Sequence, residues 1–157
     1  MFIVCSKLTV VKAFAYESLR PEDALDGICY RKHTVPAWTA ALAPEFEAEL
    51  HALSAPVRVE LFAQARVIEV FGPNAKRPRV DTLKGSKHAN MKELRFDADG
   101  GVWRVAFAFD PERKAILLVA ADKSGGGERS FYRRLIARAD KRFDAHLARM
   151  RARRARK

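Results

Sequence analysis

The chain has 157 residues, enough for one domain with a real core, and its 48% hydrophobic content excludes an intrinsically disordered protein. The formal net charge of +11 indicates an anionic partner, either nucleic acid or an acidic protein. No apolar run is long enough to span a bilayer, and Cys5 and Cys29 have no metal-ligand spacing. We therefore expect a cytoplasmic protein with two free thiols, no metal and no other cofactor.

The two ends of the chain differ in charge, because the whole excess of basic residues lies downstream of Cys29. We predict an N-terminal extension at residues 1–30, a folded domain at 31–150 and a basic tail at 151–157. The tail is expected to be frayed without a partner.

Two interpretations of the N-terminal extension stay open. No methionine stands between Met1 and Met91, so translation from a valine codon at Val35 would make the extension a misassigned, disordered start. Alternatively, the strand-like composition of FIVCSKLTVV favours an extra strand or arm.

The first elements of the domain are a strand predicted at 34–42 and two amphipathic helices. The first helix is expected to begin at Pro44, and the second at Ser54 and to end before the Gly-Pro pair at 72–73. Both show apolar residues at helical spacing, with Val57, Leu61, Ala65 and Ile68 forming the stripe of the second. Together they predict a helical hairpin.

A polar, basic loop is expected next at 74–90, with a short bridge at 80–83. Hairpin connections at 97–101 and 110–114 then join three antiparallel strands, at 92–96, 102–109 and 115–121. The third strand is apolar throughout, which predicts an interior strand buried on both faces.

The last element is a predicted helix at 131–150 with one apolar side and one arginine-rich side. The fold class that follows is α+β. We expect a small antiparallel sheet packed on a two-helix hairpin, with a C-terminal helix.

The strand at 102–109 carries an unusual arginine. Side chains alternate across a strand, so Trp103 and Phe107 share the core face while Arg104 lies on the other face among alanines. Small neighbours leave room above Arg104 for something to bind.

Three segments carry a resemblance to a known family. VDTLKGSKHANMKELRF, GGVWRVAFAFDPERKAILLVAADKSG and FYRRLIARADKRFDAHL resemble the phage-derived, HigB-like branch of the RelE/ParE superfamily, the toxins of bacterial type II toxin–antitoxin modules. The resemblance runs from about residue 35 to 147. It implies a RelE-like fold whose concave sheet face binds RNA. It also implies metal-independent cleavage, in which the RNA 2′-hydroxyl attacks the adjacent phosphate with help from a base, an acid and cations.

The resemblance assigns roles to four residues. Arg104 matches the arginine expected to hold the scissile phosphate, for which its planar, always charged fork is suited. Lys123 matches a basic position after the last strand, and Arg129 a basic position ahead of the final helix. Tyr132 matches a tyrosine whose ring stacks on a base or whose hydroxyl contacts the phosphate.

The lysine base of some RelE-type enzymes is missing, because Met91 and Glu93 occupy those places. Lys92, Glu93 and the loop residue His88 are the candidates left, and alternation puts Lys92 on the face away from Glu93. His88 is the histidine with a pKa suited to proton transfer. We therefore include it among the catalytic candidates, beside the interpretation that it is a solvated loop residue.

Structural interpretations stand beside the functional ones. Glu93 and Arg95 share a strand face and could simply pair with Arg104, although Arg95 is also a candidate RNA contact. Lys84 and Lys87 flank a glycine that would permit close approach to phosphate, but basic loops are often only solvated. Tyr132 could likewise be only a packing residue at the start of the last helix. Both tryptophans are expected in the core.

The predicted function is a toxin that cleaves messenger RNA on the ribosome and thereby inhibits translation. Its partners would be the ribosome, messenger RNA and an acidic or DNA-binding antitoxin, with no membrane. Two alternatives stay open: a ParE-like inhibitor of gyrase without nuclease activity, and a catalytically decayed RNA-binding protein.

Overall fold

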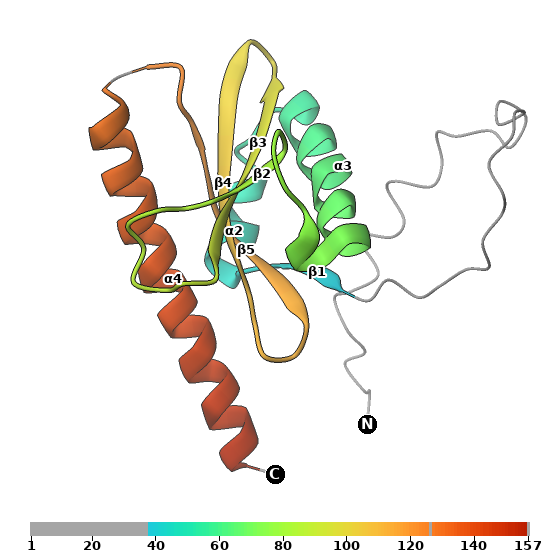
Figure 1. Ribbon diagram of the computed structural model, residues 1–157, viewed down its shortest axis with the longest axis vertical. Coiled ribbons are helices and arrows are strands. Elements are labelled where there is room, and N and C mark those ends of the chain that lie inside the picture. Colours follow the sequence, from blue (N-terminus) through green and yellow to red (C-terminus); the bar gives the residue numbers. More distant parts are fainter. Residues whose placement is uncertain (1–37, 126, 157) are drawn as a thin grey trace, which may run out of the picture. The chain divides into compact units, whose positions relative to one another are not determined.

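The computed structural model describes residues 38–125 and 127–156, and the predictions for the N-terminal extension lie outside these residues. Five strands form one sheet in the spatial order β1-β5-β4-β3-β2 (Figure 1). The strands are β1 (Thr39–Leu42), β2 (Val80–Thr82), β3 (Met91–Ala98), β4 (Gly101–Phe109) and β5 (Lys114–Asp122). The helices are α2 (Pro44–Leu50), α3 (Ala55–Phe71) and α4 (Glu128–Ala155), with a short 3-10 turn at Gly72–Asn74.

The predicted α+β class is confirmed, with one correction to the sheet. Strands β2 to β5 pair antiparallel, but β1 pairs parallel with β5, with Thr39 opposite Lys114. A parallel neighbour requires a long connection, and here two helices and three strands separate β1 from β5 in the chain. Sequence patterns along β1 contain no information about that distant partner.

Local sequence accounts for both helices that follow β1. Proline occupies the first turn of α2 and of α3, where its missing N–H costs nothing. The predicted stripe of α3 is buried, as expected. α3 ends at Phe71. The next residue, Gly72, has a φ of 54°, which favours glycine, and a Cβ there would lie 2.3 Å from the Trp38 ring.

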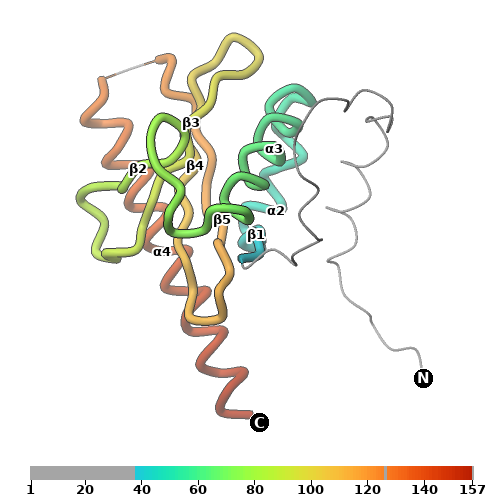
Figure 2. The backbone as a smooth tube through the Cα atoms, turned by 45° about the vertical axis from the view of Figure 1, so that its right-hand side comes forward, coloured from blue at the N-terminus to red at the C-terminus, as the bar shows by residue number. Residues whose placement is uncertain are grey.

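The sheet lies between α3 and α4 in both views (Figures 1 and 2). α3 packs on β3 and β1, whereas α4 packs on β5 and β4. As a result β4 is buried on both faces from Val105 to Phe109, and β5 is the interior strand that its composition predicts. On the face that carries Arg104, Ala106 and Ala108 are fully buried, whereas Arg104 itself is half-buried and accessible.

α4 is longer than predicted. The tail expected to fray is helical up to Ala155, because alanine and arginine are among the strongest helix formers. Met150 is its last buried residue, and residues 151–156 are all exposed. Although α4 has 28 residues, neither it nor another helix of the described part has an apolar stretch sufficient to cross a bilayer.

Candidate functional site

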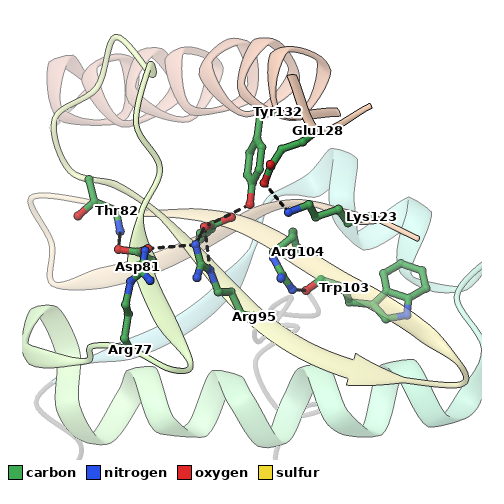
Figure 3. Close-up of polar contacts among 10 residues, drawn as sticks. Arg77, Asp81, Thr82, Arg95, Trp103, Arg104, Lys123, Glu128 and Tyr132 are labelled. Atoms are coloured by element: carbon green, nitrogen blue, oxygen red, sulfur yellow. Dashed lines mark hydrogen bonds and ion pairs between the residues drawn. The ribbon is translucent and has the colours of Figure 1, made fainter. Parts of the chain in front are cut away.

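Two arginines face each other at the accessible end of the sheet. In the antiparallel pair of β3 and β4, Arg95 lies directly opposite Arg104, and Glu93 shares their face. Two like charges in that position would repel each other if they stood alone. Carboxylates of Glu93 and Asp81 compensate the charge of Arg95, and the cluster is built around this arrangement (Figure 3).

Glu93 is the buried carboxylate of the cluster, only 2% exposed. One of its oxygens accepts a hydrogen bond from Arg95 Nε at 2.9 Å, and the Tyr132 hydroxyl of α4 lies 3.5 Å from that oxygen. The other oxygen is buried without a hydrogen-bond partner. Glu93 thus pairs with Arg95 and not with Arg104, the partner that the structural interpretation named, and α4 brings a tyrosine close to this pair.

Arg95 also pairs with Asp81 of β2, whose carboxylate lies 3.0 Å from its Nη2. Burial acts to lower the pKa of Arg95, but the hydrogen bond and charge of Glu93 and the charge of Asp81 outweigh burial and raise the pKa above its ordinary value. Asp81 is held in turn by Arg77, with 2.5 Å between the charged atoms. Arg95 is therefore fixed in place by two carboxylates.

Arg104 has a different environment. It donates from Nη1 to the carbonyl of Trp103 at 2.8 Å, and its Nε is buried without a partner. Its neighbour on β5 is Ala121. Among residues 38–125 and 127–156, no carboxylate lies within ion-pair distance of Arg104, and the side chain is half-buried. Arg104 keeps donors available for an anion.

Lys123 and Tyr132 complete the cluster from the other side. Lys123 lies 5.3 Å from the centre of the Tyr132 ring and 2.6 Å from a carboxylate oxygen of Glu128, at the start of α4. The hydrogen bond from Lys123 lowers the pKa of Glu128, with smaller contributions from the charges of Arg104 and Arg95. The charges of Lys123, Arg104 and Arg95 therefore all act on Glu128.

The predicted loop candidates lie elsewhere. His88 contacts Asp144 of α4 at 3.0 Å, and Lys87 pairs with the same carboxylate. The His88 ring also packs edge-on against Phe143. Asp144 is twelve residues beyond Tyr132 on the helix, which corresponds to about 18 Å. The structure thus uses His88 and Lys87 to fasten the loop to α4, away from Arg104.

The remaining two predicted contacts are exposed. Lys84 lies on the same loop, and Arg129 lies in the first turn of α4, one turn before Tyr132. Both tryptophans, which were expected in the core, are partly buried and pack against it. Trp103 donates its ring N–H to the carbonyl of Ala98 at 3.2 Å.

Sequence reasoning missed three members of the cluster: Arg77, Asp81 and Glu128. Each pairs with a residue near it in the chain or across a strand pair, but Asp81 and Arg77 lay in a segment predicted as loop. The strand-like triplet at 80–82 was the available signal, since alternation places Asp81 on the face of Glu93.

These features define a small α+β protein with cations gathered at one end of its sheet. Residues 48–144, more than half of the chain, match the family described as phage-derived protein Gp49-like. The chain belongs to this family. It is 42% identical to the candidate toxin HigB2 of Mycobacterium tuberculosis (strain H37Rv) over 112 residues, which are 71% of this chain and 55% of that protein. It is 39% identical to the candidate toxin HigB3 of the same organism over 107 residues, which are 68% of this chain and 91% of that protein.

The chain thus spans about half the length of the first relative and nearly all of the second. The resemblance to the HigB-like branch is confirmed by these two proteins. A solved structure of a double arginine-to-alanine variant of the E. coli toxin RelE in its free state is also similar, with a TM-score of 0.46 and 13% identity over 64% of this chain and 94% of that chain. A similarity at that level adds nothing to the family assignment.

Proposed function

We propose that the protein is the toxin of a type II toxin–antitoxin module and that it cleaves messenger RNA on the ribosome. The names of its two relatives support the toxin assignment. The observation that carries the chemistry is Arg104, a half-buried arginine with a buried, unpartnered Nε and no carboxylate of the described residues beside it. Within the part of the chain that the structure describes, the one hydrogen bond of this guanidinium goes from Nη1 to the Trp103 carbonyl, so further N–H donors remain for an anion.

The proposed reaction requires no metal. The 2′-oxygen of the RNA forms a bond to the adjacent phosphorus, its proton passes to a base, and the 5′-oxygen leaves and takes up a proton. Negative charge develops on the phosphate oxygens during this step. Arg104 would donate to these oxygens in the geometry that its planar fork favours, and Lys123 would add a second positive charge.

The other residues of the cluster would position the RNA. Tyr132 offers a ring for stacking on a base, and the Lys123 ammonium above that ring keeps it oriented. Arg95 is held by Glu93 and Asp81. In this proposal its main contribution is positive charge at the surface, and a direct contact with the RNA is secondary. Arg129, one turn before Tyr132, would contact the RNA backbone.

The partners in this proposal are messenger RNA, the ribosome and an antitoxin, all in the cytoplasm. The loop with Lys84, Lys87 and His88 would meet RNA outside the cleavage point, because it is fastened to α4 about 18 Å from Tyr132 along the helix. The charge of +11 favours the approach of the protein to ribosomal RNA.

The test is induced expression of the native chain, Arg104→Ala and Arg104→Lys, with Arg151→Ala as the matched arginine control on the exposed end of α4. We measure growth and map new 5′ ends on cellular messenger RNA. Arg104→Ala should lower cleavage at least about 100-fold, the usual loss for a donor that acts on developing charge. Arg104→Lys should recover part of it, and Arg151→Ala should cleave like the native chain.

Three outcomes would contradict the proposal. Cleavage that persists in Arg104→Ala would remove the role of this arginine. Growth arrest without new messenger RNA ends, together with inhibited DNA supercoiling, would identify a gyrase inhibitor. RNA binding with neither arrest nor cleavage would identify a protein that only binds.

A further inference from the structure

The outward side of α3 exposes large apolar side chains. Val59, Val70 and Phe71 are 69%, 59% and 55% exposed, the large hydrophobic side chains with most exposure among the described residues. Val59, Ala63 and Val70 stand at i, i+4 and i+11 of one stripe on the helix, and the exposed cation Arg66 stands between them at i+7. The opposite side of α3 is buried in the core. Large apolar side chains gathered on an exposed helix side are typical of a side that a partner covers.

A hollow at the C-terminal end of α3 continues this stripe. Its apolar lining includes Val67, Phe71 and Pro78. Its remaining lining includes the exposed cations Lys76, Arg77 and Arg79, and it contains no carboxylate. The stripe and the hollow together, which we call the α3 face, therefore combine apolar surface with positive charge at one end.

We propose that the α3 face binds an acidic amphipathic helix of the antitoxin. This proposal rests on the proposed toxin function for the identity of the partner, but its chemistry rests on the α3 face alone. From Val59 to Val70 the stripe extends over eleven residues, about 16 Å, which matches about three turns of a partner helix. Leucine-like side chains would cover the stripe, and carboxylates would meet the three cations of the hollow.

The position of the α3 face has a consequence for regulation. α3 and α4 lie on opposite faces of the sheet, and Arg104 lies on the side of α4 (Figures 1 and 3). A partner helix bound to the α3 face would therefore not cover Arg104. The hollow is nevertheless connected to the cluster, because Arg77 pairs with Asp81 and Asp81 pairs with Arg95. A partner carboxylate on Arg77 would compete with Asp81.

The first test measures binding of a synthetic, labelled 18-residue helix with leucines on one side and glutamates on the other to the full chain by fluorescence anisotropy. A peptide with lysines in place of the glutamates serves as the ligand control. Val70→Ser and Lys76→Glu should each weaken binding about tenfold, as expected for central contacts. Arg151→Glu, the charge control on α4, should change it less than about twofold. Thermal melts of each variant confirm that it is folded.

The result that overturns the proposal is binding that depends on Arg151 and not on Val70, since the peptide would then be held by the charge of α4. Equal binding of the lysine peptide would also overturn it. Neither result depends on RNA cleavage, so this measurement distinguishes failure of the α3 face from failure of the toxin function.

The second test uses a photocrosslinking residue, Val70→p-benzoylphenylalanine, in the full chain co-expressed and purified with its cognate antitoxin. Crosslinks to an acidic helix of the antitoxin are expected. Crosslinks to a second copy of this chain, or to residues 1–37 of the same chain, would identify another occupant and overturn the proposal. In cells, Val70→Asp should still arrest growth but should escape neutralisation by the antitoxin.

Discussion

α3 and α4 occupy equivalent positions on opposite faces of one sheet, yet they present opposite chemistry to the outside. Both bury a stripe of apolar residues against the sheet. The outward side of α3 carries Val59 and Val70, whereas the outward side of α4 carries arginines. The inward faces are similar because each helix buries its apolar residues in the core. The outward faces differ because α3 exposes apolar side chains there and α4 exposes arginines, so the two faces suit partners of different chemistry.

The two helices are also anchored differently. α4 is tied to α2 by ion pairs that include Arg138 to Glu49 at 2.7 Å and Arg149 to Glu45 at 3.1 Å, and it fastens the basic loop through Asp144. α3 is held mainly by its buried apolar stripe. Charge therefore supplements packing on one face of the sheet, and packing dominates on the other.

The largest effect on the free energy of unfolding is expected for a substitution on the buried side of α3, compared with one on its outward side. Leu61→Ala removes a fully buried side chain and should lower the free energy of unfolding by about 3 kcal/mol, through lost burial and the cavity left behind. Val59→Ala, on the outward side, should change it by less than about 0.5 kcal/mol. Urea denaturation of both variants provides the measurement. A loss of similar size in Val59→Ala would mean that this side is already covered within the chain.

A smaller effect is expected at the buried charge between β3 and α4. Glu93→Gln removes the charge that compensates Arg95 and should destabilise the fold by about 2 kcal/mol, less than the usual cost of breaking a buried pair. The reason is that Arg95 is 25% exposed and keeps Asp81 as a partner. Glu112→Gln, an exposed carboxylate paired with Lys114, is the control and should be nearly neutral. Unchanged stability in Glu93→Gln would show that solvent already screens this pair.

The smallest effect is a pH dependence from the ion pairs of α4. The hydrogen bond from Arg142, with its charge and that of Arg138, lowers the pKa of Glu49 below its ordinary value of 4.5 despite partial burial. A carboxylate with a lowered pKa in the folded state stabilises the fold above pH 4.5 and loses that contribution as the pH falls through the folded-state value. The free energy of unfolding should therefore decrease below about pH 5.

Glu49→Gln should show a shallower acid decrease than the native chain in urea denaturation between about pH 5 and pH 3. Glu47→Gln, two residues earlier and exposed, serves as the control and should follow the native chain. Parallel curves for all three proteins would show that the pairs of α4 contribute too little to be measured, which is the usual result for exposed ion pairs.

Much of the fold and part of the site could be predicted from the sequence. The alternation of β3 and β4 placed Glu93, Arg95 and Arg104 on one face before any tertiary information, and the structure has them there. The family resemblance drew attention to Lys123 and Tyr132, which the structure brings together. The loop candidate His88 could not be placed, because its partner Asp144 is 56 residues away in the chain.

What the sequence determined by itself is local: the helices and strands, their apolar sides, and the strand face on which Arg104 stands. These follow from side-chain periodicity over a few residues. The tertiary structure decided the parallel position of β1, the path of α4 over the alanines beside Arg104, and the pairing of Asp81 with Arg95. It also decided that α3 keeps an apolar side uncovered among the described residues. The physical reason is that these features depend on which distant surfaces pack together to bury the most apolar area, and no local pattern specifies that choice.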